Sequence, residues 1–196
     1  MSAQESQFKA AMRCLTGHVC LITTGSDEGR RAGLTATAVC SVSAVPPMLL
    51  VCVNRANASS QSILAAGQFC VNVLPWSGVG LANHFASPVA PEQKFLEGDW
   101  QTGSTGLPLL TSALATFECR ISQIVEAGTH NVFIADVLGT MVRQTDAGPL
   151  LYSGGAYGQL APAGTRAIHE LLWVSNWDPE NTLNTTLLTE ETGTIR

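Results

Sequence analysis

Charged residues are scarce in this chain of 196 residues. Only 13% of the residues are Asp, Glu, Lys or Arg, and lysine occurs just twice, at Lys9 and Lys94. Soluble domains average roughly 25% charged residues, so a surface this poor in charge predicts that part of it is covered in a homodimer. The net charge of −5 and the scattered arginines argue against nucleic acid as a partner, because phosphate binding needs clustered Lys and Arg.

Long apolar runs are also missing. No stretch approaches the ~18–20 residues that a membrane span requires, and residues 1–15 lack the charged-then-apolar pattern of a secretion signal. These absences predict a cytoplasmic protein with no membrane partner. No cysteine pair has CxxC spacing, so we expect no metal site and no disulfides. Five cysteines lie in apolar, strand-like runs and are predicted to be buried free thiols: Cys20, Cys40, Cys52, Cys70 and Cys119.

The common nucleotide and hydrolase motifs are absent. The chain has no G-x-G-x-x-G after a strand, no P-loop, no G-x-S-x-G elbow and no H-E-x-x-H. The glycine-rich segment SGGAYG at 153–158 follows a strand without opening a helix, which makes it a weak phosphate-loop candidate. Any nucleotide chemistry must therefore use a fold other than the Rossmann or P-loop designs.

What the sequence does contain is a series of short apolar strands separated by turn signals. Short helices are predicted at 5–15, 58–67 and 76–85, and the segment from 86 to 110 is predicted to be irregular. Tandem prolines at 46 and 47 mark a tight connection between two strands. This pattern predicts a mainly β fold, a closed or nearly closed antiparallel barrel over residues 1–160. Residues 161–196 are predicted to form a C-terminal extension or arm.

Residues 32–44 form an unusual predicted strand, because small hydroxyl residues crowd it. Thr35, Thr37, Ser41 and Ser43 lie at odd positions and would share one face of an extended strand. Small side chains let a flat ligand approach the backbone closely, and hydroxyls add donors and acceptors without fixed charge. The alternative is an edge strand whose hydroxyls face water.

The segment that follows, NRANASSQSI, places polar residues between a strand and the start of a helix. A helix N-terminus with free N–H groups and nearby hydroxyls is an anion site, and Asn54, Ser59 and Ser60 would supply such groups. The alternative is ordinary capping of the helix by Ser59 or Ser60.

Seven segments together resemble the flavin reductase-like family. They occur in family order between about Phe8 and Leu160, and the tail from Ala161 is not covered: GLTATAVCSVSAVPPMLLVCVNRANASSQSI, FCVNVL, LANHFA, KF…W, GLPLLTSALATFECRI, GTHNVFIADV and PLLYSGGAY. The resemblance implies an FMN-binding split β-barrel, a homodimer that binds FMN or FAD. It also implies an NAD(P)H:flavin oxidoreductase that uses NADH or NADPH and supplies reduced flavin to a partner monooxygenase.

The same resemblance implies a set of site residues. His130 in GTHNVF matches the family's G-D-H site beside the flavin and the nicotinamide, with Thr129 in place of the usual Asp. Phe85 and Tyr157 are candidates to stack on the flavin or the nicotinamide, and each is otherwise an ordinary core or interface aromatic. Ala58 stands where many relatives carry a basic residue, which predicts a flavin that exchanges freely. The implied cofactor-binding residues are Thr35, Ala36, Thr37, Ser41, Val42, Ser43, Cys52, Asn54, Ser59, Ser60, Asn83 and Phe85.

Two other functions are compatible with the same residues. A flavoprotein that retains its flavin could reduce another acceptor, such as a corrin, a quinone-like compound or a metal complex. A flavin- or haem-binding carrier or sensor would bind the group without turnover. Both FMN and FAD fit the sequence pattern, and Arg55, Arg143 and Arg166 are candidates to read the 2′-phosphate that distinguishes NADPH from NADH.

Overall fold

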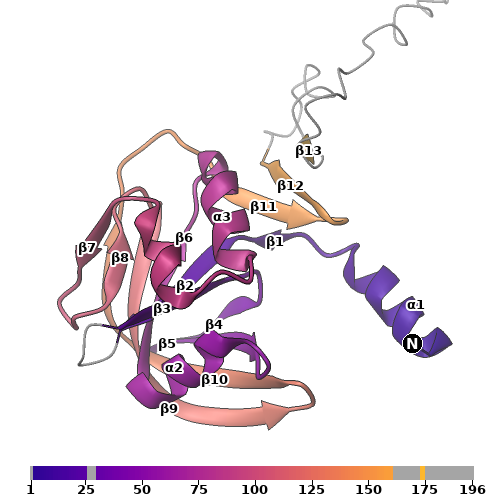
Figure 1. The fold of residues 1–196 in the computed structure, drawn as a ribbon, viewed down its shortest axis with the longest axis horizontal. Helices are drawn as coiled ribbons and strands as arrows, with labels where there is room; N and C mark the ends of the chain where they lie inside the picture. Colours follow the sequence, from indigo (N-terminus) through magenta and orange to yellow (C-terminus); the bar gives the residue numbers. More distant parts are fainter. Residues whose placement is uncertain (1, 26–29, 161–172, 175–196) are drawn as a thin grey trace, which may run out of the picture.

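The computed structural model describes residues 2–25, 30–160 and 173–174. Its centre is a seven-stranded antiparallel sheet in the order β3-β2-β6-β9-β10-β5-β4, strongly curved around an apolar core (Figure 1). Its strands are β2 (Cys20–Gly25), β3 (Arg31–Ala36), β4 (Val39–Ala44), β5 (Pro47–Asn54), β6 (Gln68–Val73), β9 (Ala115–Ala127) and β10 (His130–Val142).

Two smaller sheets and a few helices surround this sheet. One small sheet has the order β1-β11-β12-β13, with β1 (Gly17–His18), β11 (Leu150–Ser153), β12 (Ala156–Gln159) and β13 (Trp173–Val174). The other pairs β7 (Trp100–Thr102) with β8 (Pro108–Leu110). The helices are α1 (Ala3–Met12), α2 (Ala58–Ala66) and α3 (Val79–Ala86), with 3₁₀ turns η1 (Trp76–Gly78) and η2 (Pro91–Leu96). No helix in the described residues is long and apolar enough to span a membrane.

One core cluster lies on the concave face of the large sheet, and a second packs α3 and β11 against the other face of β2. Along β10, Asn131, Phe133 and Ala135 are buried and alternate with more exposed residues, as expected for a strand with one covered face. Phe133 packs against Phe69 of β6, with ring centroids 6.4 Å apart. The edge strands β3 and β4 are not hydrogen-bonded to each other, so the barrel is split rather than closed. The predicted mainly β, antiparallel split barrel is confirmed.

The predicted single strand over 32–44 is wrong. The chain leaves β3 after Ala36, bends at Thr37 and Ala38, and begins β4 at Val39. β3 pairs with β2, whereas β4 pairs with β5 at the opposite edge of the sheet. The hydroxyl residues therefore do not share one face, and a register shift between Ser41 and Ser43 interrupts the alternation further.

Three further local expectations need correction. The side chain of Asn57 caps α2 by accepting from the Ser59 N–H, so neither Ser59 nor Ser60 is the cap, although α2 does end at Gly67 as predicted. The segment 86–110 is not irregular, because it contains η2, β7 and β8. Cys40 is exposed and Cys52 only half-buried, because both project from the convex face of β4 and β5. Cys20, Cys70 and Cys119 are buried as predicted.

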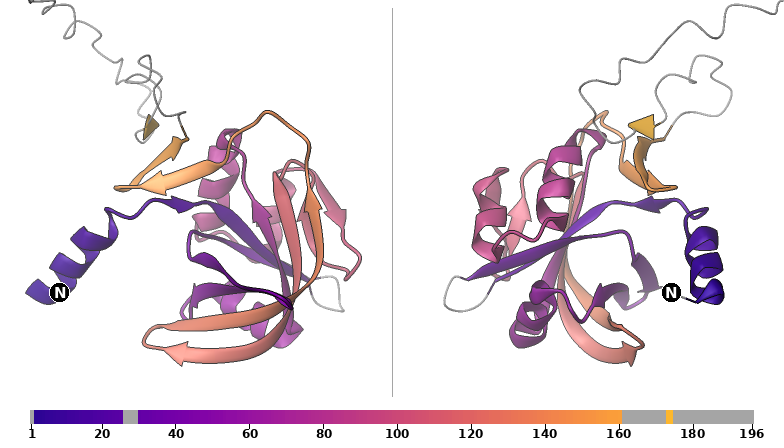
Figure 2. Two further views of the ribbon diagram at one scale, coloured as in Figure 1. Left: turned by 180° about the vertical axis from the view of Figure 1, so that it is seen from behind. Right: turned by 45° about the vertical axis from the view of Figure 1, so that its right-hand side comes forward.

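Helix α1 stands apart from the barrel. None of its residues is buried, and both views in Figure 2 show it projecting away from the sheets. Phe8, Met12 and the following Leu15 are 65%, 47% and 62% exposed. An apolar stripe left uncovered in this way is typical of a surface that meets another molecule. The predicted arm lies outside the described residues except for Trp173–Val174, which pairs with β12, so its boundary at residue 161 stays a prediction.

Candidate functional site

A cleft of about 340 Å³ opens between β3, α3 and the β11–β12 hairpin. Thr35, Ala36 and Thr37 form one wall, and Asn83 and Tyr157 lie on the opposite side. None of the side chains that line this cleft is charged at neutral pH. The small residues expose the backbone of the 35–37 segment to a bound molecule. The structure thus brings together five of the predicted site residues in one cleft.

The aromatic wall of this cleft is held by a polar contact. The Tyr157 hydroxyl donates to Asn83 Oδ1 at 3.0 Å, and its ring meets Tyr152 edge-on with centroids 5.3 Å apart. Burial, and then the neighbouring Tyr152, raise the pKa of Tyr157 above its usual value, so the hydroxyl remains a donor at neutral pH. The hairpin turns at Gly154 and Gly155, both with positive φ, a conformation that glycine adopts without strain. The segment SGGAYG is therefore a hairpin, not a phosphate loop.

Phe85 does not line the cleft. Its side chain is fully buried and packs against Phe95 and Trp100, with centroids 5.3 and 5.5 Å away. A ring enclosed on all sides offers no face to a nicotinamide or a flavin. The structure therefore does not place Phe85 where a bound ring could stack on it, and the residue forms the packed floor beneath α3.

His130 lies on the other side of the 36–38 segment. It stands directly opposite Asn54 in the β5–β10 ladder, and its neighbour pair is Val132 opposite Cys52. Residues opposite one another share a face, so His130, Asn54 and Cys52 all lie on the convex face of the sheet. The Thr129 hydroxyl is 2.9 Å from His130 Nδ1 and takes the place of a carboxylate partner.

A backbone hydrogen bond connects the 36–38 segment beside the cleft with β5, the strand that carries Cys52. The Cys52 N–H donates to the Ala38 carbonyl at 3.0 Å, which sets the chain before Ala38 beside the chain after Cys52. The 36–38 segment consequently runs between the cleft at Asn83 and the strand ends at Asn54 and His130.

The predicted anion site at the start of α2 stays a prediction, and the structure places two of its three residues in the core. Ser59 and Ser60 are buried, at 1% and 0% exposure. The Ser59 hydroxyl donates to the Gly33 carbonyl at 2.8 Å, and the Ser60 hydroxyl accepts from Asn131. The amides are engaged as well, because Ser59 N–H donates to Asn57 Oδ1 and Ser60 N–H to the Asn57 carbonyl. These serines tie α2 to the core, and neither side chain is exposed at the surface of this structure.

The arginine candidates are likewise engaged or distant from this site. Arg55 pairs with Glu126 at 2.8 Å and donates to the Gly128 carbonyl. Arg143 donates to the Thr111 carbonyl at 3.2 Å, and Arg166 lies outside the described residues. Both described candidates, Arg55 and Arg143, are therefore engaged elsewhere, whereas Arg13 lines a neighbouring groove that shares Thr37, Tyr152 and Gly155 with the cleft.

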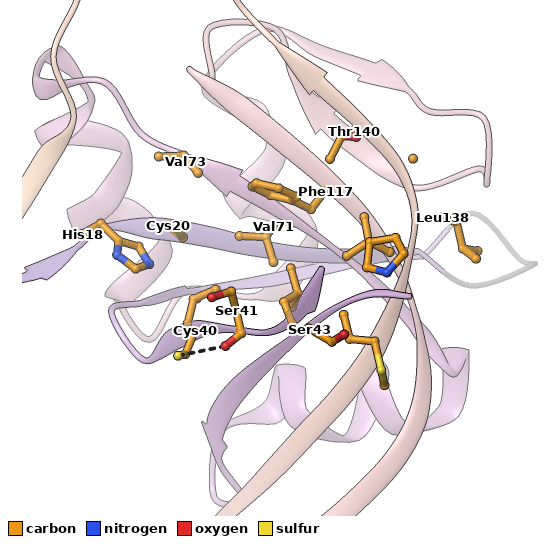
Figure 3. Close-up of a pocket in the computed structure, with 16 residues that line it drawn as sticks. His18, Cys20, Cys40, Ser41, Ser43, Val71, Val73, Phe117, Leu138 and Thr140 are labelled. Carbon is orange, nitrogen blue, oxygen red and sulfur yellow. Dashed lines mark hydrogen bonds between the residues drawn. The ribbon is translucent and has the colours of Figure 1, made fainter. Parts of the chain in front are cut away.

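A second, larger cavity of about 620 Å³ lies at the mouth of the barrel. Figure 3 shows Ser41, Ser43 and Cys40 on one side of it and Val71, Val73 and Phe117 on the other. The predicted residues of the hydroxyl stretch are thus divided between two cavities, and Val42 is 47% exposed outside both lining sets. His18 and Phe117 also line this cavity, and no motif in the sequence singled them out.

The chain belongs to the flavin reductase-like family. The family model described as "Flavin reductase like domain" matches residues 12–161, which is most of the chain and includes every cleft residue. The cleft and His130 therefore lie within the family's shared domain, whereas most of α1 lies outside it.

Relatives and solved structures support this assignment. The chain is 40% identical over 156 residues to "FMN reductase (NADH) RutF" of Enterobacter cloacae, covering 80% of this chain and 94% of the relative. It is 43% identical over 133 residues to the RutF of Ancylobacter novellus, covering 68% and 73%. Among solved structures, the NADH:FAD oxidoreductase SgcE6 of Streptomyces globisporus, in complex with NAD and FAD fragments, has a TM-score of 0.75, 30% identity and coverage of 82% and 94%. Flavin reductase PheA2 has a TM-score of 0.72, 31% identity and coverage of 83% and 100%.

Proposed function

We propose that this protein is an NADH-dependent flavin reductase that reduces FMN as an exchangeable substrate. The observation that carries this proposal is the uncharged 35–37 segment, with its backbone open to the Asn83–Tyr157 cleft and its continuation beside His130. When bound, the nicotinamide supplies the hydride and the flavin accepts it at N5, chemistry that belongs to the cofactors. The protein's part is to bind both rings face to face and to exclude water.

The chain's own residues suit a flat, neutral ring that gains negative charge on reduction. Thr35 and Thr37 would hold the flavin through their backbone, and Asn83 and Tyr157 would contact its edge or the nicotinamide. Backbone N–H groups aimed at such a ring stabilise negative charge without a fixed cation. His130 would orient the nicotinamide or bond the flavin edge rather than serve as an obligatory proton donor. Cys52 and Asn54 would flank the same ring on the convex face.

Weak phosphate binding explains why the flavin would exchange. Ala58 stands at the first position of α2, Ser59 and Ser60 are buried, and Arg55 is paired with Glu126. An anion in this region therefore meets no free cation among the described residues, and retention of FMN or FAD would depend on the ring alone. Named relatives are FMN reductases, which supports FMN as the first flavin to test and FAD as the second.

The pairing of Arg55 with Glu126 favours NADH over NADPH. Discrimination for NADPH requires a basic group at the 2′-phosphate, and Arg55 already gives its charge to Glu126. Names of relatives also specify NADH. We therefore propose NADH as the physiological hydride donor.

The partners proposed are a second copy of the chain and a monooxygenase component. The exposed stripe of Phe8, Met12 and Leu15 on the projecting N-terminal segment supports a homodimer, since such a stripe is stabilised by burial. Structural neighbours described as "component B" of nitrilotriacetate monooxygenase and as the reductase of a two-component tryptophan halogenase support an oxygenase or halogenase partner. A cytoplasmic location stays a prediction that cell fractionation would test.

The deciding experiment follows NADH at 340 nm in air with purified protein and added FMN or FAD. Saturable oxidation that requires added flavin, and a higher kcat/KM for NADH than for NADPH, is the expected result. Flavin that survives dialysis and passes electrons to a second acceptor would replace this proposal with a retained-flavin reductase. Quenched flavin fluorescence without NADH oxidation would replace it with a carrier or sensor.

A further inference from the structure

Lys94 is a buried cation that the proposed reaction does not use. It lies in η2 and is only 6% exposed. Its ammonium donates to the Phe85 carbonyl at 2.8 Å and to the Gly33 carbonyl at 3.2 Å. No salt bridge to a carboxylate is found for Lys94 in the part of the chain that the structure describes. Burying a charge without a counter-ion costs free energy, and the hydrogen bonds to these two carbonyls offset that cost.

The two carbonyls that Lys94 joins belong to the two walls of the cleft. Gly33 lies on β3, two residues before Thr35, and Phe85 lies in the last turn of α3, two residues after Asn83. A cation at the C-terminus of a helix is also favourable, because the free carbonyls there carry partial negative charge. Lys94 therefore binds α3 at its end and fastens it to β3.

The surrounding contacts show that α3 and β3 pack closely here, and we call this contact the α3 seam. The Thr35 hydroxyl donates to the Ala82 carbonyl at 2.6 Å, which is a second link between the same walls. The ring of Phe85 lies against the backbone of Gly33, where an added Cβ would come within 2.7 Å of it. Thr35 also lines the cleft and could contact a ligand directly. Lys94 does not line the cleft, so it would act only by holding the two walls together.

We propose that Lys94 is a positioning residue of the flavin reductase reaction, which sets the distance between the β3 wall and Asn83 on α3. Without its ammonium the end of α3 moves relative to β3, and the cleft loses the geometry in which Asn83 and Tyr157 face the 35–37 backbone. The inference rests on the proposed function, since it presumes that this cleft binds the flavin. It predicts an effect on ligand affinity that exceeds the effect on folding.

The test is a variant series with two matched controls. Lys94→Met removes the charge and both hydrogen bonds, Lys94→Gln retains a shorter donor, and Lys94→Arg retains charge and several donors. Lys9→Met removes the only other lysine, on exposed α1. Glu118→Gln perturbs a different buried polar residue, which binds Ser104 and Thr105 rather than the carbonyls of Gly33 and Phe85, and controls for lost stability.

Flavin affinity is measured by fluorescence quenching with FMN, and KM, kcat and Tm are measured on the same samples. We expect Lys94→Met to weaken FMN binding and raise the KM for FMN by about tenfold, with a smaller change in kcat. Lys94→Gln should fall between Lys94→Met and wild type, and Lys94→Arg should recover most of the affinity. Glu118→Gln should lower Tm without weakening FMN binding, and Lys9→Met should change neither.

Each other outcome counts against a specific statement. Wild-type FMN affinity in a folded Lys94→Met protein overturns the positioning role while leaving the proposed function intact. Failure of both Lys94→Met and Lys94→Gln to fold, or equal loss of affinity in Glu118→Gln, makes Lys94 a stability residue and also overturns it. If wild-type protein binds no FMN and oxidises no NADH, the proposed function itself fails, which the wild-type measurement reveals before any variant is compared.

Discussion

The aromatic ring of Phe85 occupies the space beside Gly33 that a side chain would need. A Cβ atom on Gly33 would lie 2.7 Å from Phe85 Cε1 and 3.0 Å from the Ile22 carbonyl oxygen. The ring is wedged beneath α3 by Phe95 and Trp100, so it has little room to retreat. The absence of a side chain at residue 33 is therefore what allows α3 to lie close to β3.

We expect Gly33→Ala to destabilise the protein by about 1–3 kcal/mol, the usual cost of overpacking a core. FMN affinity should fall as well, because α3 would be pushed away from the 35–37 wall. The matched control is Gly80→Ala on α3, where an added Cβ meets nothing within 4 Å. That change should stabilise the helix by about 0.5–1 kcal/mol, since alanine is the better helix former. Urea unfolding followed by circular dichroism measures both, and equal stability of the two variants would contradict the seam geometry.

Cys40 is an accessible thiol on the strand that follows the 36–38 segment. It is exposed and lines the cavity at the barrel mouth, whereas Cys20 and Cys119 are buried with pKa values raised to about 12 by burial. Because the thiolate is the reactive form, the buried thiols should resist alkylation. We expect iodoacetamide to label Cys40 and Cys14 first. If FMN binds next to β4, it should slow labelling at Cys40 and leave Cys14 unaffected.

Peptide mass spectrometry at a series of times gives both rates in one sample. Cys14 is the internal control, because it is exposed beyond the end of α1. Labelling at Cys40 should also inhibit FMN-dependent NADH oxidation, and Cys40→Ser should keep its activity after the same treatment. Equal protection of both cysteines by FMN would instead indicate general shielding, such as dimer formation.

The sequence predicts the fold better than it predicts the site, and the 32–44 stretch shows why. Its composition correctly indicated extended chain with small side chains, and its contact with a ligand stays a prediction. Its periodicity indicated one strand, because nothing in the letters Thr37 and Ala38 marks a bend as Pro46 and Pro47 mark the next turn. The bend depends on tertiary contacts, since β3 pairs with β2 and β4 with β5.

Burial accounts for the other differences between the predicted and the observed positions of the site residues. Ser59 and Ser60 have the residue types of an anion site, yet their hydroxyls point into the core toward Gly33 and Asn131. Phe85 has the residue type of a stacking partner, yet three sides of its ring meet other parts of the chain. Residue type limits which contacts a side chain can make, and only the packing of α2 and α3 on the sheet selects among them.

Glu118 is predicted to make stability depend on pH in the acid range. Its carboxylate is 7% exposed and accepts hydrogen bonds from the backbone and hydroxyl groups of Ser104 and Thr105. Burial alone would raise its pKa, but these four donors outweigh burial and hold the pKa below the usual value. The ionised form therefore stabilises the folded state above the unfolded-state pKa of about 4.3, and this contribution is lost as pH falls through the lower folded pKa.

Glu118→Gln should remove most of this dependence. The amide leaves at least one of the four donors unpaired, so we expect a loss of about 1–3 kcal/mol at pH 7. Wild-type unfolding free energy should fall more steeply than that of the variant between about pH 5 and pH 3. Urea titrations at several pH values measure this difference. Parallel curves for the two proteins would show that Glu118 is not the group responsible.

Variants at His130 and Thr129 test whether the convex face takes part in the reaction. It stands opposite Asn54, and Thr129 Oγ1 lies 2.9 Å from its Nδ1 atom. If His130 orients the nicotinamide, His130→Ala should lower kcat/KM for NADH by about tenfold through KM, and kcat should change less. Thr129→Val removes only the hydroxyl and should cause a smaller loss of the same kind.

The control for these two variants is Arg120→Gln, an exposed change on β9, a strand that also pairs with β10 but far from His130. It should leave kcat/KM for NADH unchanged. Stopped-flow reduction of FMN under anaerobic conditions separates hydride transfer from flavin exchange. Should His130→Ala keep the full kcat/KM for NADH, the convex face would have no part in binding the nicotinamide. The Asn83–Tyr157 cleft alone would then have to hold both rings.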